Sequence, residues 1–145
     1  MRILLALVLL CACGDNQDPE EAKAMWERIH QENYRGFARA PGYETRQPSN
    51  TAHSDQVDIY VNDVLAQAQP GIASWPVGSL IVKDGFTSDG ELELVAVMDK
   101  RDDGWFWVEY NDVAAGEAKY SGKPDICTGC HESGADFVRA FTFPE

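Results

Sequence analysis

Three runs rich in β-branched and aromatic residues lie close together in the second half of the chain, and they restrict its fold more than any other feature. They are "GSLIVKDGF" at 78–86, "ELELVAVMDK" at 91–100 and "GWFWVEY" at 104–110. Such residues favour strands. The segments between the runs, Ser88-Asp89-Gly90 and Arg101-Asp102-Asp103-Gly104, are typical of turns. The sequence therefore predicts an antiparallel meander.

An amphipathic helix is predicted to precede these strands. Asp18 stands at the N-cap, Pro19 follows in the first turn, and Glu20 and Glu21 face the positive end of the helix dipole. We expect the helix to reach about Tyr34. Its apolar positions recur every three or four residues, which predicts a core-facing side made by Ala22, Met25, Trp26, Ile29 and Asn33.

A loop, a strand and a second short helix are predicted between the first helix and the meander. Residues 36–55 are rich in Gly, Pro, Ser, Thr and Asn, and long loops within compact domains are often functional. In "QVDIYVND", residues 56–63, apolar and polar side chains alternate, which predicts a half-buried strand. Asn62 or Asp63 then begins a short helix that reaches Ala68.

The end of the chain is predicted to be less regular. Residues 116–124 lack periodicity, and Pro124 begins a short helical turn. At 145 residues the chain has the length of one domain. The expected fold class is mainly β (α+β), with an antiparallel β-sheet, an N-terminal helix and a short C-terminal helical segment.

The first thirteen residues, "MRILLALVLLCAC", have the pattern of an export signal. Their apolar run is too short to cross a bilayer as a permanent helix. Residues 10–13 resemble a bacterial lipobox, which predicts a signal peptide at 1–12, lipidation of Cys13, a tether at 13–18 and a folded domain at 19–145. An ordinary secretory signal is the alternative. Gly14 after the lipidated cysteine favours the outer membrane, on the periplasmic side of a bacterial envelope.

The charge of the chain is strongly acidic. The formal net charge is −12, and it becomes −13 when Arg2 leaves with the signal peptide. Nucleic acid is therefore not expected as a partner.

Cys127 and Cys130 are the cysteines that remain once Cys11 is cleaved off and Cys13 is lipidated. In an oxidising compartment they must pair, bind a metal or be capped. With His131 they form Cys-x-x-Cys-His, the attachment signature of c-type haem. On a helical turn the two sulfurs share a face and can add to the two vinyl groups of one haem. The adjacent His131 then becomes the proximal ligand of the iron.

Three other uses of this motif are less well supported. A zinc site needs four ligands, and His30 and His53 are the only histidines elsewhere in the chain. A thioredoxin-like cysteine pair would be expected in a βαβ unit. A disulfide across two residues closes too small a loop to add much stability. The sequence therefore favours one haem c, attached covalently through two thioethers.

Several segments, taken in order, resemble the cytochrome P-460 family, which is related to the β-sheet type of cytochrome c′. They are His53 before "VDIYVN", "WPVGSLIVKDGF" at 75–86, "VAVMDKRDDGWFWVEY" at 95–110 and "CTGCHESGADFVRAF" at 127–141. The similarity extends over roughly residues 26–143. It implies a mainly antiparallel β fold with one five-coordinate haem, a proximal histidine and an open distal side.

The resemblance also implies roles for residues across the iron. In cytochromes P-460 a lysine is bonded to the haem edge, and these proteins oxidise hydroxylamine or bind nitric oxide. Lys83 occupies the matching segment and shares a strand face with Ile81, although a solvent-facing lysine is the alternative. The resemblance also places a histidine at position 53 without defining its role, and a sixth ligand, a distal hydrogen bonder and a loop cap are the alternatives for His53. Met98, in mid-strand, is more typical of a core residue than of a ligand.

Candidates for the distal pocket are Phe86, Phe106 and Glu109. Burial would raise the pKa of Glu109, which could then act as a base or a hydrogen-bond donor toward a bound nitrogen oxide. A surface glutamate is the alternative. Trp105 and Trp107 alternate with Phe106 and are expected to pack on the helix.

Three functional hypotheses follow. The first is an exported, lipid-anchored mono-haem c protein with an open iron site, which binds nitric oxide or oxidises hydroxylamine-like compounds as an oxidoreductase. The second is an electron-transfer cytochrome with six-coordinate iron, and the third is a non-enzymatic gas-binding or sensing protein. Expected partners are a small nitrogen-oxide or hydroxylamine ligand, a redox partner protein, a membrane reached through the lipid, and a second copy of the chain as a homodimer.

Overall fold

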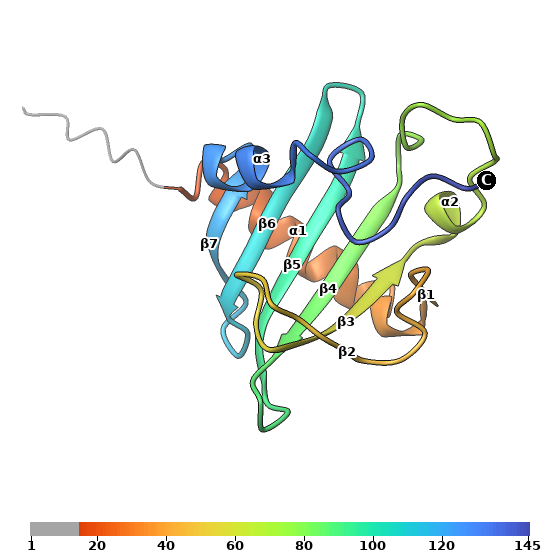
Figure 1. Ribbon diagram of the computed structural model, residues 1–145. Helices are drawn as coiled ribbons and strands as arrows, with labels where there is room; N and C mark the ends of the chain where they lie inside the picture. The colour runs from red at the N-terminus through yellow and green to blue at the C-terminus, as the bar shows by residue number, and fades with distance from the viewer. Residues whose placement is uncertain (1–14) are drawn as a thin grey trace, which may run out of the picture.

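The computed structural model describes residues 15–145 (Figure 1). The predicted signal peptide and the predicted lipid site Cys13 lie outside these residues. No helix of the described chain has both the length and the apolar character needed to cross a membrane.

One antiparallel sheet forms the centre of the described chain. Its strands are β1 (Ala38–Arg39), β2 (Gln47–Pro48), β3 (Gln56–Val61), β4 (Leu80–Phe86), β5 (Leu92–Arg101), β6 (Gly104–Asp112) and β7 (Glu117–Gly122). The order is β1-β3-β4-β5-β6-β7, with β2 also paired to β3. The predicted meander and the mainly β class are confirmed.

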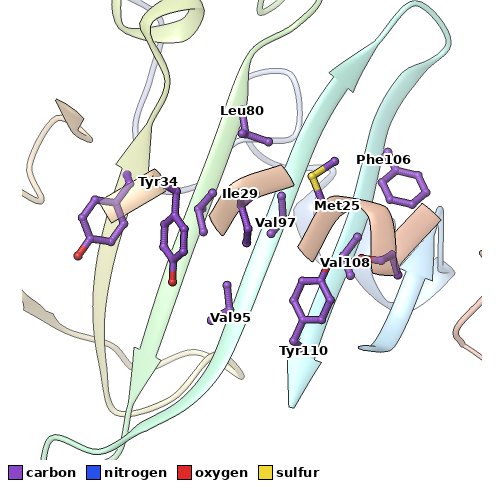
Figure 2. Close-up of a cluster of buried hydrophobic side chains, with 12 residues drawn as sticks. Met25, Ile29, Tyr34, Leu80, Val95, Val97, Phe106, Val108 and Tyr110 are labelled. Carbon is purple, nitrogen blue, oxygen red and sulfur yellow. Dashed lines mark hydrogen bonds between the residues drawn. The ribbon is translucent and has the colours of Figure 1, made fainter. Parts of the chain in front are cut away.

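Helix α1 (Pro19–Gln31) covers one face of the sheet (Figure 1). The Asp18 side chain caps the helix by accepting a hydrogen bond from the Glu21 N–H, at 3.2 Å. Met25 and Ile29 are buried in a cluster with side chains from β4, β5 and β6, as Figure 2 shows. The helix ends at Gln31 rather than near Tyr34, because Asn33 takes a left-handed conformation with φ 51°.

The opposite face carries α2 (Asp63–Ala66), α3 (Asp125–His131) and the segment that follows α3. Alternation along β6 decides which side chains meet which face. Phe106 points toward α1, whereas Trp105 and Trp107 belong to the second core, under the C-terminal segment. The expected packing of the two tryptophans on the helix is therefore wrong.

Strand β3 is buried on both faces, so the prediction of a half-buried strand is also wrong. Asp58 can be buried because Arg39 and Arg46, from the preceding segment, form ion pairs with its carboxylate.

Asp84 on β4 lies opposite Asp58 in the strand register and is 1% exposed. It accepts hydrogen bonds from the Tyr34 hydroxyl and from Arg35 Nε, each at 2.7 Å.

Two segments that were expected to be irregular form strands. Residues 36–55 contain β1 and β2, and residues 117–122 form β7 at the edge of the sheet. These strands are short or polar, and pairing with β3 and β6 rather than intrinsic propensity holds them.

The start of the described chain is bound to β7. Residue Gln17 donates its N–H to the Ser121 carbonyl at 3.1 Å, and Ser121 donates its N–H to the Asp15 carbonyl at the same distance. The Asp18 N–H also reaches the Ser121 hydroxyl, at 2.7 Å. Residues 15–18, which were expected to be tether, are therefore attached to the domain.

We expect Asp84→Ala to lower the free energy of unfolding by about 3 kcal/mol, because Tyr34 and Arg35 lose a buried charged acceptor. Urea unfolding followed by circular dichroism measures the change. Asp102→Ala, at an exposed turn position, is the matched control and should change stability by about 0.5 kcal/mol or less. Equal effects of the two substitutions would contradict a structural role for Asp84.

Candidate cofactor site

Helix α3 carries the cysteine and histidine motif. Pro124 precedes the helix, and its carbonyl accepts hydrogen bonds from the N–H groups of Cys127 and Thr128 at 3.0 Å. Both thiols are free. Burial raises the pKa of Cys127 to about 11, so this thiol is protonated at neutral pH. The predicted helical turn around the cysteines is confirmed.

Two adjoining cavities of about 290 Å³ each lie between α3, the sheet and the loop before β3. The first cavity is lined by six of the predicted site residues, which are His53, Lys83, Glu109, Cys127, Cys130 and His131. Phe86 and Phe106 are not among the lining residues of either cavity. The proposed distal roles of these two phenylalanines are therefore wrong, because alternation in β4 and β6 turns them toward the other face of the sheet.

The ring of His131 is held on two sides. Its Nδ1 lies 2.9 Å from the Phe137 carbonyl, and the ring contacts Trp107 with centroids 4.7 Å apart. Burial lowers the pKa of His131 to about 4. The ring is therefore neutral at pH 7, with its proton on Nδ1 because only an N–H can bond to a carbonyl. Its Nε2 keeps a free lone pair, as a metal ligand requires.

The Phe137 carbonyl is positioned by its neighbour Asp136. Both residues have positive φ, 47° for Asp136 and 68° for Phe137. The Asp136 carboxylate accepts a hydrogen bond from Lys100 Nζ at 2.8 Å and one from the Trp75 N–H at 2.8 Å. The Asp136 carbonyl accepts one from Trp105 Nε1 at 2.7 Å. The sequence does not predict these contacts, because Trp75, Lys100 and Trp105 are distant from Asp136 in the chain and meet it only in the folded protein.

Lys83 projects from β4 into the cavities, which agrees with the predicted strand face. Burial lowers the pKa of its ammonium group to about 8, although the Glu109 carboxylate acts in the opposite direction. About a tenth of Lys83 is thus a neutral amine at pH 7, far more than for an ordinary lysine. The side chain of Lys83 is partly buried, so the alternative of a solvent-facing lysine is wrong.

Glu109 and His53 meet across the cavity. Nδ1 of His53 lies 2.8 Å from Glu109 Oε2, with the carboxylate oxygen away from the ideal N–H direction. Burial by itself would raise the pKa of Glu109, but His53 and Asn111 outweigh it and the pKa is lowered. The raised pKa expected for Glu109 is therefore wrong, and the group is a carboxylate at neutral pH.

The cavity lining is cationic although the chain as a whole is acidic. Lys83, Lys119 and Arg139 line the two cavities, and Glu109 is the acidic residue among the lining residues. Apolar side chains, including Ile81, complete the first cavity. A site of this kind suits a flat apolar group that carries carboxylates at its edge.

The residues fit haem c. The protonated thiol of Cys127 and the exposed thiol of Cys130 lie on one helical turn, and the imidazole of His131 with its free Nε2 follows them. The cationic side chains of the cavity lining could pair with the two propionate groups of a haem. Among residues 15–145 no three His, Cys, Asp or Glu side chains gather as a metal-binding group.

No protein-family model and no curated protein matches the chain.

The lowered pKa of Lys83 can be tested in a Cys127→Ser/Cys130→Ser protein. Its amine should react with a small acylating reagent with a midpoint near pH 8, since the neutral amine is the reactive form. An ordinary lysine has a pKa of about 10.4. Peptide mapping by mass spectrometry gives the pH profile, with the exposed Lys23 as the reference site. A Lys83 midpoint above pH 10 would show that burial does not act on this group.

Proposed function

We propose that the chain is an exported mono-haem c protein whose iron binds nitric oxide or takes part in the oxidation of hydroxylamine-like nitrogen compounds. The observation that carries this proposal is the arrangement of α3. It turns Cys127, Cys130 and His131 toward one cavity, and the Phe137 carbonyl holds His131 in the tautomer that a metal ligand needs.

The protein supplies attachment, orientation and polarity in this proposal. The thiols of Cys127 and Cys130 would form the two thioether bonds, and Nε2 of His131 would ligate the iron. The bound haem would supply an iron centre able to bind small nitrogen compounds and exchange electrons. Trp107 supports the ring of His131 from the sheet.

Residues on the cavity wall define the chemistry available to a bound ligand. Lys83 is the candidate for a bond to the haem edge, as the resemblance to cytochromes P-460 implies. Glu109, as a carboxylate, can accept a proton from a hydroxylamine-like compound and pass it to His53, which lies beside it. Turnover and simple binding of nitric oxide would use the same cavity.

An electron-transfer cytochrome is the second candidate function. It is favoured by the position of His53, whose ring lies 6.1 Å from that of His131. A second axial histidine would favour electron transfer over ligand binding.

For either function, the predicted signal and lipid site would place the protein on the periplasmic side of a bacterial envelope, with the outer membrane favoured.

Covalent attachment is tested by expression in a host that attaches haem c. We expect Cys127→Ser/Cys130→Ser to lose covalent haem completely, because both vinyl partners are removed. Intact-protein mass and the haemochrome spectrum measure the attachment. Gly129→Ala is the matched control within the motif, because a Cβ at this position meets no other atom within 4 Å. Haem that stays covalently bound in the double variant would contradict the proposal.

The reaction is tested by optical spectra of the reduced protein with and without nitric oxide. We expect nitric oxide to shift the main absorption band, because the cavity lets a small ligand reach the iron, whether or not a protein ligand must first be displaced. A strongly red-shifted band before nitric oxide is added would indicate a bond from Lys83, and Lys83→Arg should remove it. A low-spin spectrum that nitric oxide leaves unchanged would contradict ligand binding and leave electron transfer as the function.

A further inference from the structure

Both histidines of the cavity have Nδ1 close to an oxygen, His131 in a hydrogen bond and His53 in a contact that lies off the N–H direction. His131 uses Nδ1 toward the Phe137 carbonyl, and His53 has its Nδ1 2.8 Å from Glu109 Oε2. A histidine that binds a metal through one ring nitrogen usually has a carbonyl, a carboxylate or water at the other. His131 therefore has the outer hydrogen bond of a metal ligand, His53 has a carboxylate beside its Nδ1, and both rings leave Nε2 for the metal.

The separation of the two rings fits one metal atom between them. Their centroids are 6.1 Å apart and their planes make an angle of 67°. With metal–nitrogen bonds of about 2 Å, and a ring centre about 1 Å behind each nitrogen, two imidazoles on opposite sides of one metal have centres about 6 Å apart.

Cavity space extends to both sides of the two rings. Both cavities are lined by His53 and His131. The first extends toward Tyr120 and Ile126, and the second extends toward Tyr43 and Pro48. The histidine pair thus stands where the two cavities meet, which is where the centre of a flat cofactor filling both would lie.

We propose that His53 is the second axial ligand of the iron that His131 binds, so that the chain itself closes the iron in its resting state. A nitrogen-oxide ligand then has to displace His53. This inference rests on the proposed function and adds a regulatory step to it. It differs from the permanently open distal side that the family resemblance implies.

The loop that carries His53 can release the ring without disturbing the sheet. Its base is closed by the Ser49 N–H, which donates to the Asp55 carbonyl at 2.7 Å, and Asp55 is bound to the Phe86 carbonyl of β4. Residues 50–52, between these fixed points, are exposed. Movement of the tip costs the contact of His53 with Glu109 and leaves every strand pairing in place.

Glu109 is a positioning residue in this proposal. It lies on β6, a central strand, and its carboxylate is largely buried at 12% side-chain exposure. Its negative charge beside Nδ1 can therefore favour this orientation of the His53 ring and make Nε2 a stronger donor. Met98 also lines the first cavity, but it is fixed in β5, which is paired on both sides.

The test compares the purified haem protein with three variants: His53→Ala, Glu109→Gln and His30→Ala. His30 is an exposed histidine of α1 and is the matched control. We expect a low-spin, six-coordinate ferric spectrum, by optical absorption and electron paramagnetic resonance, for the wild type and for His30→Ala. His53→Ala should be high-spin, and added imidazole should restore its low-spin spectrum. Glu109→Gln should contain a larger high-spin fraction than the wild type.

Binding kinetics of nitric oxide provide the second measurement. The wild-type rate should reach a plateau at high ligand concentration, because release of His53 becomes limiting, whereas His53→Ala should show a rate that rises linearly. If His53 occupies the iron nine times in ten, the apparent affinity for nitric oxide should rise about tenfold in His53→Ala.

The outcomes separate this inference from the proposed function. A wild-type protein without covalent haem would overturn both. A wild-type protein with covalent haem and a high-spin resting spectrum would overturn the role of His53 and leave the proposed function in place. A low-spin spectrum that persists in His53→Ala would also overturn it, and loss of that spectrum in Lys83→Ala or Met98→Leu would identify the ligand instead.

Discussion

The two-residue alternation of the central strands is the constraint on which both the fold and the cavity depend. On β6, Phe106 and Tyr110 pack against α1, while Trp107 and Glu109 face the cavity. On β4, Asp84 is bound on the α1 side and Lys83 reaches the cavity. A shift of one residue in the register would exchange these sets, so stability and site geometry are specified together.

The orientation of the His131 ring depends on a second, more local feature. The two left-handed residues at 136 and 137 turn a carbonyl toward His131, and this costly conformation is held by Lys100 and Trp75 through the Asp136 carboxylate. The orientation of the histidine is thus determined by strands β5 and β6 and by the loop before β4, although the histidine itself belongs to α3. The motif alone does not orient its histidine.

Much of the fold could be predicted from the sequence because its signals are local. Strands β4, β5 and β6 are dense in β-branched and aromatic residues, and α1 has a cap and an apolar period. The features that could not be predicted are the burial and the ionisation of acidic side chains, which depend on residues distant in the sequence. Burial of Asp58 requires Arg39 and Arg46, and the ionised state of Glu109 requires His53 from another segment. The site residues themselves could be named from the motif and the resemblance, but not their contacts.

The attachment of residues 15–18 to β7 bears on how the domain would meet a membrane. If Cys13 carries lipid, only three peptide units separate it from Asn16, whose side chain donates to the Ala118 carbonyl of β7. Three residues span about 11 Å at full extension. The segment between Cys13 and Asn16 would therefore be too short to let the domain rotate freely relative to the membrane. It would keep the β7 edge next to the lipid headgroups and give the domain one preferred orientation on the bilayer.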